Sequence, residues 1–184
     1  MAKQKIIITG GPSTGKTAII NNLEASGYFC FNEFIRSITR EAIENDASIN
    51  FVSNPIASVT DPHQFNLQLL TGRIQQYLDA IKFDKDIVFF DRGIPDVLAY
   101  MDLFNQTYDE TFIKACNDHR YDTIFLLPPW KEIFVSDNER QESFEEAEQV
   151  YHHLSSTYTK LGYNCIEVPF ETIENRTKFI LSNL

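Results

Sequence analysis

The sequence has few cysteines and no long apolar run. Its three cysteines, Cys30, Cys116 and Cys165, form neither a Cys-x-x-Cys pair nor a Cys/His ligand spacing. A disulfide framework and a structural zinc site are therefore not indicated. No apolar run approaches the roughly 18 residues of a membrane helix, and the first residues lack the apolar stretch of at least about seven residues that a signal peptide needs. We therefore expect a cytoplasmic protein without a membrane partner.

Basic residues are also scarce. The chain has 16 Lys and Arg against 26 Asp and Glu, which gives a formal net charge of −10 at pH 7. A field of that sign opposes the phosphate contacts of non-specific nucleic-acid binding, so no nucleic-acid partner is expected. With 184 residues, 43% of them hydrophobic, and no internal repeat or linker, the chain predicts one globular domain over residues 1–184, as a monomer or homodimer.

Short apolar runs alternate with amphipathic segments along the chain. The runs are rich in β-branched and aromatic residues, as strands buried on both faces should be, and cover residues 5–9, 28–31, 87–90, 123–127 and 164–168. Helix start signals lie between them, at Asp61 with Pro62 and at the capping box from Ser143 to Glu146. Strands that alternate with helices predict an α/β domain of three layers around a five-stranded parallel sheet.

The apolar spacing after these start signals predicts the buried face of each helix. After Asp61, the face of a long helix is expected to carry Leu67, Leu70, Ile74, Tyr77 and Ile81. After Ser143, a second stripe runs to Leu161, and Gly162 is expected to end that helix as a left-handed C-cap.

A glycine-rich loop follows the first predicted strand. The sequence GGPSTGKT matches the pattern G-x-x-x-x-G-K-S/T, and an apolar helical pattern follows it. In this strand–loop–helix setting, backbone N–H groups surround a polyphosphate, aided by the positive end of the helix dipole. The alternative is a purely structural glycine-rich turn before a helix. The candidate residues for binding a nucleoside triphosphate are Gly10, Gly11, Pro12, Ser13, Thr14, Gly15, Lys16 and Thr17.

Each required position of this loop has a chemical reason. At Gly10 and Gly15 a Cβ atom would obstruct the close approach of the backbone or the required dihedral angles. Lys16 supplies a compact cation to the β- and γ-phosphate oxygens, which makes it a catalytic candidate, and Thr17 offers its hydroxyl to a magnesium ion.

The third predicted strand ends in a carboxylate that is followed by a guanidinium. Asp91 is a candidate magnesium ligand and catalytic residue, because ligands gather at the carboxyl ends of parallel strands. Arg92 offers a phosphate-binding fork, for catalysis or for the substrate. A turn aspartate and a surface salt bridge are the respective alternatives.

Two further segments carry candidates for the acceptor side. After the second strand, Glu33 is a candidate general base and substrate ligand. Arg36 lies three residues later and is a candidate ligand for a substrate anion. The alternative is that Glu33 and Arg36 form an ion pair within one helix. Arg40 and Arg73 are secondary candidates. After the fourth strand, residues 129–143 have the length of a lid, in which Arg140 is the candidate catalytic cation; a solvated arginine is the alternative.

These motifs together resemble the P-loop nucleoside and nucleotide kinase superfamily. The closer likeness is to single-domain AAA-type predicted ATPases related to the NadR-like ribosylnicotinamide kinases, and residues 10–17, 32–36, 89–100 and 126–147 carry it. The resemblance implies strand order 2-3-1-4-5 with a short lid, ATP and Mg²⁺ as ligands, and phosphoryl transfer to a nucleoside, riboside or nucleotide-like acceptor. It also implies that Glu33 acts as the base, with Asp91 and Arg92 framing the phosphates. The lid has one well-placed arginine, fewer than nucleotide kinases commonly have.

Two other functions stay open at this point. One is an ATPase or nucleotide-dependent regulatory switch without a small-molecule acceptor, and the other is a binding module that keeps the loop without the chemistry. A guanine switch is disfavoured, because the element N/T-K-x-D is absent: the nearest segment, which begins at Thr177-Lys178, lacks the aspartate.

Overall fold

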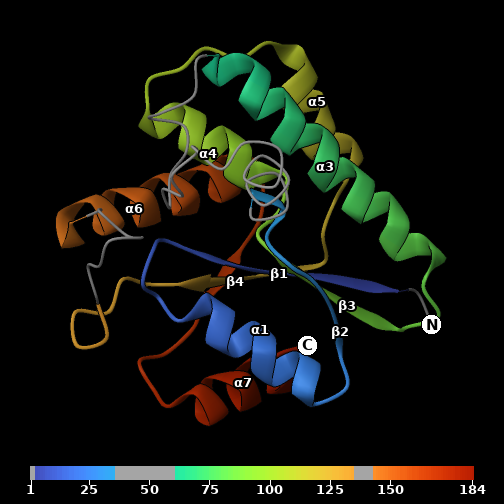
Figure 1. The fold of residues 1–184 in the computed structure, drawn as a ribbon, viewed down its shortest axis with the longest axis vertical. Helices are drawn as coiled ribbons and strands as arrows, with labels where there is room; N and C mark the ends of the chain where they lie inside the picture. Colours follow the sequence, from blue (N-terminus) through green and yellow to red (C-terminus); the bar gives the residue numbers. More distant parts are fainter. Residues whose placement is uncertain (1–2, 36–60, 135–142) are drawn as a thin grey trace, which may run out of the picture.

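A computed structural model describes residues 3–35, 61–134 and 143–184, which form a parallel sheet with helices on both faces (Figure 1). The strands occur along the sheet in the order β2-β3-β1-β4-β5, which confirms the predicted order. Their bounds are β1 (Gln4–Gly10), β2 (Phe29–Phe31), β3 (Ile87–Asp91), β4 (Thr123–Leu127) and β5 (Cys165–Glu167). All four strand pairs are parallel, as their continuous apolar sequences predict.

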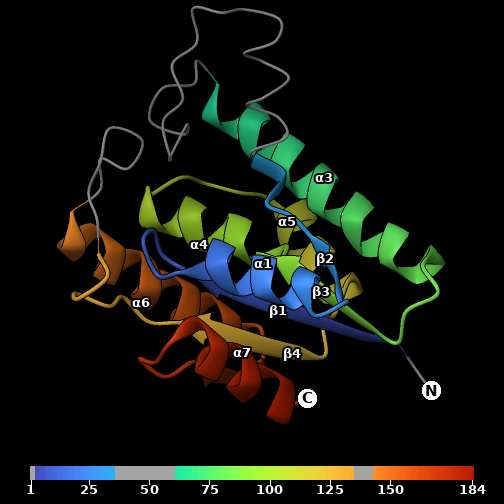
Figure 2. The same ribbon diagram turned by 60° about the horizontal axis from the view of Figure 1, so that its bottom comes forward.

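Alternate side chains of the central strand build two separate cores. Ile6 and Ile8 lie in one core with residues of α1 (Lys16–Ala25) and α7 (Ile173–Ser182). Ile7 lies in the other, under α3 (Pro62–Lys82), α4 (Pro95–Leu103), α5 (Glu110–Asp118) and α6 (Phe144–Lys160). Figure 1 shows these two groups of helices on opposite sides of the sheet, and in the turned view of Figure 2 α1 and α7 lie in front of it. Successive side chains of a strand point to opposite faces of the sheet. Because Ile6, Ile7 and Ile8 are all apolar and buried, both faces of β1 are covered.

The structure confirms the predicted starts and ends of two helices. Asp61 caps α3, with its carboxylate accepting a hydrogen bond from the Gln64 N–H at 3.0 Å. Ser143 and Glu146 form the capping box of α6, and Gly162 follows that helix with φ 79°, in the left-handed region. These caps depend only on residues that are close in the sequence, so they can be predicted without the tertiary fold.

The predicted buried face of α3 is wrong at its last turn. Leu70 is 3% exposed, but Ile81 is 62% exposed. At this end of the helix the buried residue is Ala80, and the next position points about 100° away from it. The apolar spacing alone could not distinguish which of two adjacent apolar residues is buried in the core.

The topology brings three strand ends to one edge of the sheet. The carboxyl ends of β1, β3 and β2 lead into the loop at residues 10–17, the turn after Asp91 and the segment that contains Glu33. In open α/β sheets ligands bind at this edge. Among the helices of the described residues, none is long and apolar enough to cross a membrane.

Candidate functional site

The loop between β1 and α1 depends on glycine at two positions. A Cβ atom on Gly10 would lie 2.6 Å from the backbone oxygen of Leu127, so β1 and β4 could not approach as they do. Gly15 has φ 85° and occupies the N-cap position of α1. The Thr14 hydroxyl donates to the Gly11 carbonyl oxygen at 3.0 Å, which closes the turn from within. The loop is thus a compact turn at a helix N-terminus, the arrangement that binds anions.

Lys16 is folded against this loop. Its ammonium group donates to the carbonyl oxygens of Gly10 and Gly11 at 2.9 and 2.8 Å, and the residue is 8% exposed. Burial, together with the positive charge of Arg92, lowers the pKa of Lys16 from 10.5 to about 8, against the opposing effect of Asp91. The buried ammonium group of Lys16 is poorly hydrated. A phosphate oxygen within reach would therefore stabilise its positive charge.

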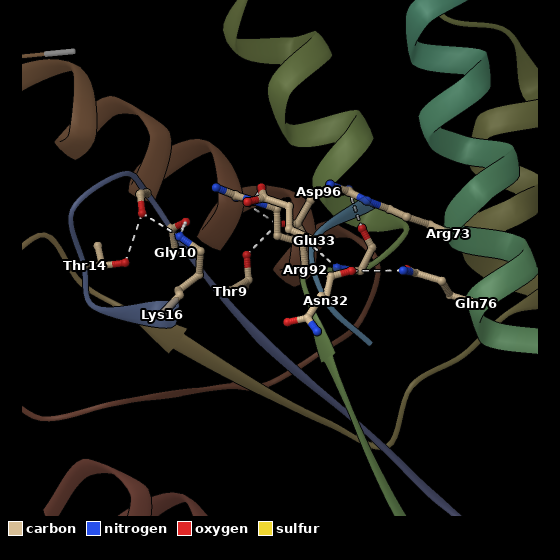
Figure 3. A network of polar contacts seen from close by, with 12 residues as sticks. Thr9, Gly10, Thr14, Lys16, Asn32, Glu33, Arg73, Gln76, Arg92 and Asp96 are labelled. Carbon is tan, nitrogen blue, oxygen red and sulfur yellow. Dashed lines mark hydrogen bonds and ion pairs between the residues drawn. The ribbon is translucent and has the colours of Figure 1, made fainter. Parts of the chain in front are cut away.

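Glu33 and Arg92 form an ion pair inside the protein. The Nε atom of Arg92 donates to the Glu33 carboxylate at 2.6 Å, and the side chains are 8% and 15% exposed respectively. Burial raises the pKa of Glu33, but the positive charges of Arg92 and Lys16 outweigh burial and lower it to about 2. Arg92 is therefore not a surface salt-bridge residue. Figure 3 shows this pair beside Lys16.

Helix α3 supports the pair from the opposite side of the site. Arg73, one of the secondary candidates, is 3% exposed and donates to the Gly93 carbonyl oxygen at 2.7 Å. Gln76 donates to the backbone oxygen of Asn32 at 3.0 Å, next to Glu33 (Figure 3). The long helix therefore fixes the chain on both sides of the ion pair.

Asp96 is a site residue that the sequence did not single out. This fully buried carboxylate accepts hydrogen bonds from the Thr9 hydroxyl, the Tyr158 hydroxyl and the Gly93 N–H, and lies 3.4 Å from Arg92. Its only local signal is an acid in the first turn of a helix, which normally indicates an exposed residue that complements the helix dipole. Its partners on β1 and α6 become neighbours only through the fold.

Thr17 and Asp91 have the chemistry that a magnesium ion requires. Asp91 is the last residue of β3, is 6% exposed, and stands beside Ile8 of β1 in the sheet, while Thr17 is the second residue of α1. Hydroxyl and carboxylate oxygens suit this hard cation. Among the described residues no cluster of three or more His, Cys, Asp or Glu could hold a metal ion. One or two protein ligands completed by phosphate oxygens are the usual arrangement for magnesium.

Several predicted residues lie outside the described part of the chain. These are Arg36, Arg40 and Arg140, together with most of the lid, of which residues 129–134 and 143 are described. The single-domain organisation also stays a prediction. The residues that the structure does bring together at one edge of the sheet are Lys16, Glu33, Asp91 and Arg92, with the loop around Lys16.

The five-stranded parallel sheet and the glycine-rich loop after its central strand define an α/β protein that carries the P-loop sequence motif. More specifically, the chain belongs to the AAA domain family, whose model matches residues 5–176. No curated protein sequence matches the chain.

Solved structures share this fold along nearly the whole chain. NadR protein in complex with NR matches with a TM-score of 0.71 at 19% identity, over 98% of this chain and 51% of that chain. Deoxyadenosine kinase from M. mycoides, with the products dCMP and dCDP, matches with a TM-score of 0.67 at 18% identity over 98% of both chains. Thymidylate kinase from Ehrlichia chaffeensis matches with a TM-score of 0.61 at 16% identity, over 100% and 99%. The chain thus spans about half the length of this NadR chain, and at these identities the likeness establishes the fold.

Proposed function

We propose that the protein is an ATP-dependent kinase that transfers the γ-phosphoryl group to a nucleoside, riboside or nucleotide-like acceptor. The observation that carries the proposal is the partly buried Glu33–Arg92 pair beside Lys16, at the edge where the phosphate loop ends. A loop that only binds a triphosphate needs no ionised carboxylate at this place. Solved structures with this fold include proteins named as deoxyadenosine kinase and thymidylate kinase, which supports the proposal.

The donor side of the reaction belongs to the loop and its neighbours. Backbone N–H groups of residues 10–17 bind the phosphates, and Lys16 stabilises negative charge on the β- and γ-oxygens. Thr17 and Asp91 would hold Mg²⁺, which neutralises phosphate charge when bound. Distant surface carboxylates weaken this site little, because charges beyond about 8 Å are screened at physiological salt.

The acceptor side belongs to Glu33 and the arginines. With a pKa near 2, Glu33 is ionised at neutral pH and can accept a hydrogen bond from an acceptor hydroxyl. Such a carboxylate is a weak base, but a loose transition state asks mainly for an oriented hydroxyl whose proton leaves late. Arg92 holds the carboxylate and binds phosphate charge. We assign acceptor binding to Arg36 and closure over the phosphoryl group to Arg140.

An acceptor screen with two variants tests this function. With ATP-Mg and a panel of nucleosides, ribosides and mononucleotides, we expect the wild type to phosphorylate at least one compound. Lys16→Ala should lower kcat/KM by at least about 10²-fold, since it removes a cation that acts on the transition state. Glu33→Gln should lower kcat much more than ATP affinity. Lys114→Ala, at an exposed lysine of α5, serves as the control.

Three outcomes would contradict the assignment. Turnover retained by Lys16→Ala would refute the catalytic role of the loop, and equal losses of kcat and ATP affinity in Glu33→Gln would make Glu33 a structural residue. ATP hydrolysis at the same rate with and without every acceptor would favour the ATPase or switch instead.

A further inference from the structure

The last helix of the protein contacts the phosphate loop through one arginine. Arg176 on α7 is 1% exposed, and its Nη1 atom donates to the backbone oxygen of Thr14 at 2.9 Å. The centre of its guanidinium lies 5.8 Å from the ring centroid of Trp130. A Cβ atom on Gly15 would lie 2.9 Å from Nη1, so this approach also requires the glycine at position 15.

The stability of the fold does not explain this arginine. Its Nε and Nη2 atoms are buried, and they have no hydrogen-bond partner among the residues that the structure describes. Burial also lowers the pKa of Arg176. Unpaired buried donors of a charged group destabilise a folded protein. Within the described part of the chain, the one hydrogen bond of the guanidinium is the bond to the loop, so we expect its role to lie there.

The geometry of the peptide unit connects this bond to phosphate binding. In a planar trans peptide, the carbonyl of Thr14 and the N–H of Gly15 point in opposite directions. A guanidinium that holds the carbonyl on the outer side of the loop therefore turns the Gly15 N–H toward the inner side. A charged donor also restrains the carbonyl about twice as strongly as a neutral one.

We propose that Arg176 is a positioning residue for the phosphate loop, which fixes the Thr14–Gly15 peptide so that the Gly15 N–H faces the phosphates of the bound nucleotide. The inference rests on the proposed function, because it assumes that residues 10–17 bind a triphosphate. Arg176 does not itself touch the phosphates. It preorganises one of the backbone donors that do, from a helix 162 residues away along the chain.

A series at position 176 tests this role. Arg176→Lys keeps a charged donor group, Arg176→Gln keeps a neutral donor group, and Arg176→Met keeps neither charge nor donor. We expect calorimetry with ATP-Mg to show affinity falling in the order Arg, Lys, Gln, Met, with a total loss of roughly 10- to 100-fold, the effect of one hydrogen bond from a charged group. Inorganic tripolyphosphate should show the same order, because the restraint acts on the phosphate side alone.

Thermal unfolding by circular dichroism separates positioning from support of the fold. Arg176→Met removes a poorly paired buried charge, so its melting temperature should stay within about 4 °C of the wild type. Ile180→Val, at a fully buried position of the same helix, is the control that loosens α7 without touching the loop. It should lower the melting temperature and leave the affinity for tripolyphosphate unchanged.

The contrary results are distinct from those of the proposed function. If the wild type binds and transfers phosphate but all four residues at position 176 give equal affinity, the positioning role is overturned and the kinase assignment stands. An effect on ATP that is absent with tripolyphosphate also overturns it. If Arg176→Met does not fold, the affinities of the Lys and Gln variants test the positioning role, which requires the Lys variant to bind more tightly than the Gln variant. If the wild type binds neither compound, the proposed function fails first and this inference with it.

Discussion

At the scale of single residues, one carboxylate connects three parts of the chain behind the site. Asp96 on α4 accepts hydrogen bonds from Thr9 at the end of β1 and from Tyr158 on α6, both at 2.5 Å, and from the Gly93 N–H at 2.9 Å. A carboxylate can accept all of these bonds at once, whereas an amide would present donors of its own to some of them.

Asn at position 96 should therefore destabilise the protein strongly. We expect Asp96→Asn to lower the free energy of unfolding by about 3 kcal/mol, since it leaves buried donors and the charge of Arg92 without their acceptor. Tyr158→Phe removes a single donor and should cost about 1 kcal/mol. Urea denaturation measures both. An Asp96→Asn variant as stable as Tyr158→Phe would contradict the role of Asp96 as the common acceptor.

The Glu33–Arg92 pair should make stability depend on pH in acid. Because folding lowers the pKa of Glu33 from 4.5 to about 2, its contribution is present above about pH 5 and is lost as the pH falls toward 2. The shift corresponds to about 3 kcal/mol. Urea denaturation at successive pH values should show this additional loss in the wild type and not in Glu33→Gln, in which Arg92 loses one of its two carboxylate partners and adds a constant cost. Parallel curves for the two proteins would contradict the pair.

Local spacing predicted the residues at the strand ends but not those that support them. Asp91 ends a strand, Arg92 directly follows it, and Lys16 begins the helix after the short loop that follows β1, so the parallel topology was enough to place them at one edge. Asp96 and Arg176 meet their partners across the fold, and no sequence pattern marks such a contact. For Glu33 the sequence offered an ion pair within one helix only as the alternative to a general base, and the structure pairs its carboxylate with an arginine 59 residues away.

At the scale of the elements, strands and caps were predictable because their signals are local. Apolar β-branched runs and capping residues depend on neighbours within a few positions. The face of a helix is different. On α3, Ala80 is buried while Ile81 is exposed, because burial of a helix face depends on which distant elements pack against it.

The junction of β1 with the loop should tolerate no side chain. Gly10 and Gly27 both have positive φ angles, 154° and 89°, but only at Gly10 would a Cβ atom meet the backbone of β4. Gly27→Ala should therefore cost about 1 to 2 kcal/mol for its backbone conformation alone. Gly10→Ala should cost about 1 to 3 kcal/mol more, because two strands must separate. Equal urea midpoints for the two variants would contradict the steric argument.

At the scale of the whole molecule, the three thiols should report on opening of the core. Burial raises the pKa of Cys30 and Cys116 to about 12 and that of the half-buried Cys165 to about 11. At pH 8 a thiol reagent should modify Cys165 first, and the other two at least about 10³-fold more slowly than in the unfolded chain, since little thiolate is present. Mass spectrometry of timed samples measures this. Modification of all three at the unfolded rate would mean that the cores open readily.

The hydrogen bond from Arg176 to Thr14 also bears on the order in which the protein folds. The two residues are 162 positions apart in the sequence, so the bond forms only when α7 has docked beside α1. The central strand likewise pairs with β3 and β4, which are both distant from it in the sequence. The short loop at residues 10–17 is therefore completed by distant segments, which makes it a late element of folding although it is local in the sequence.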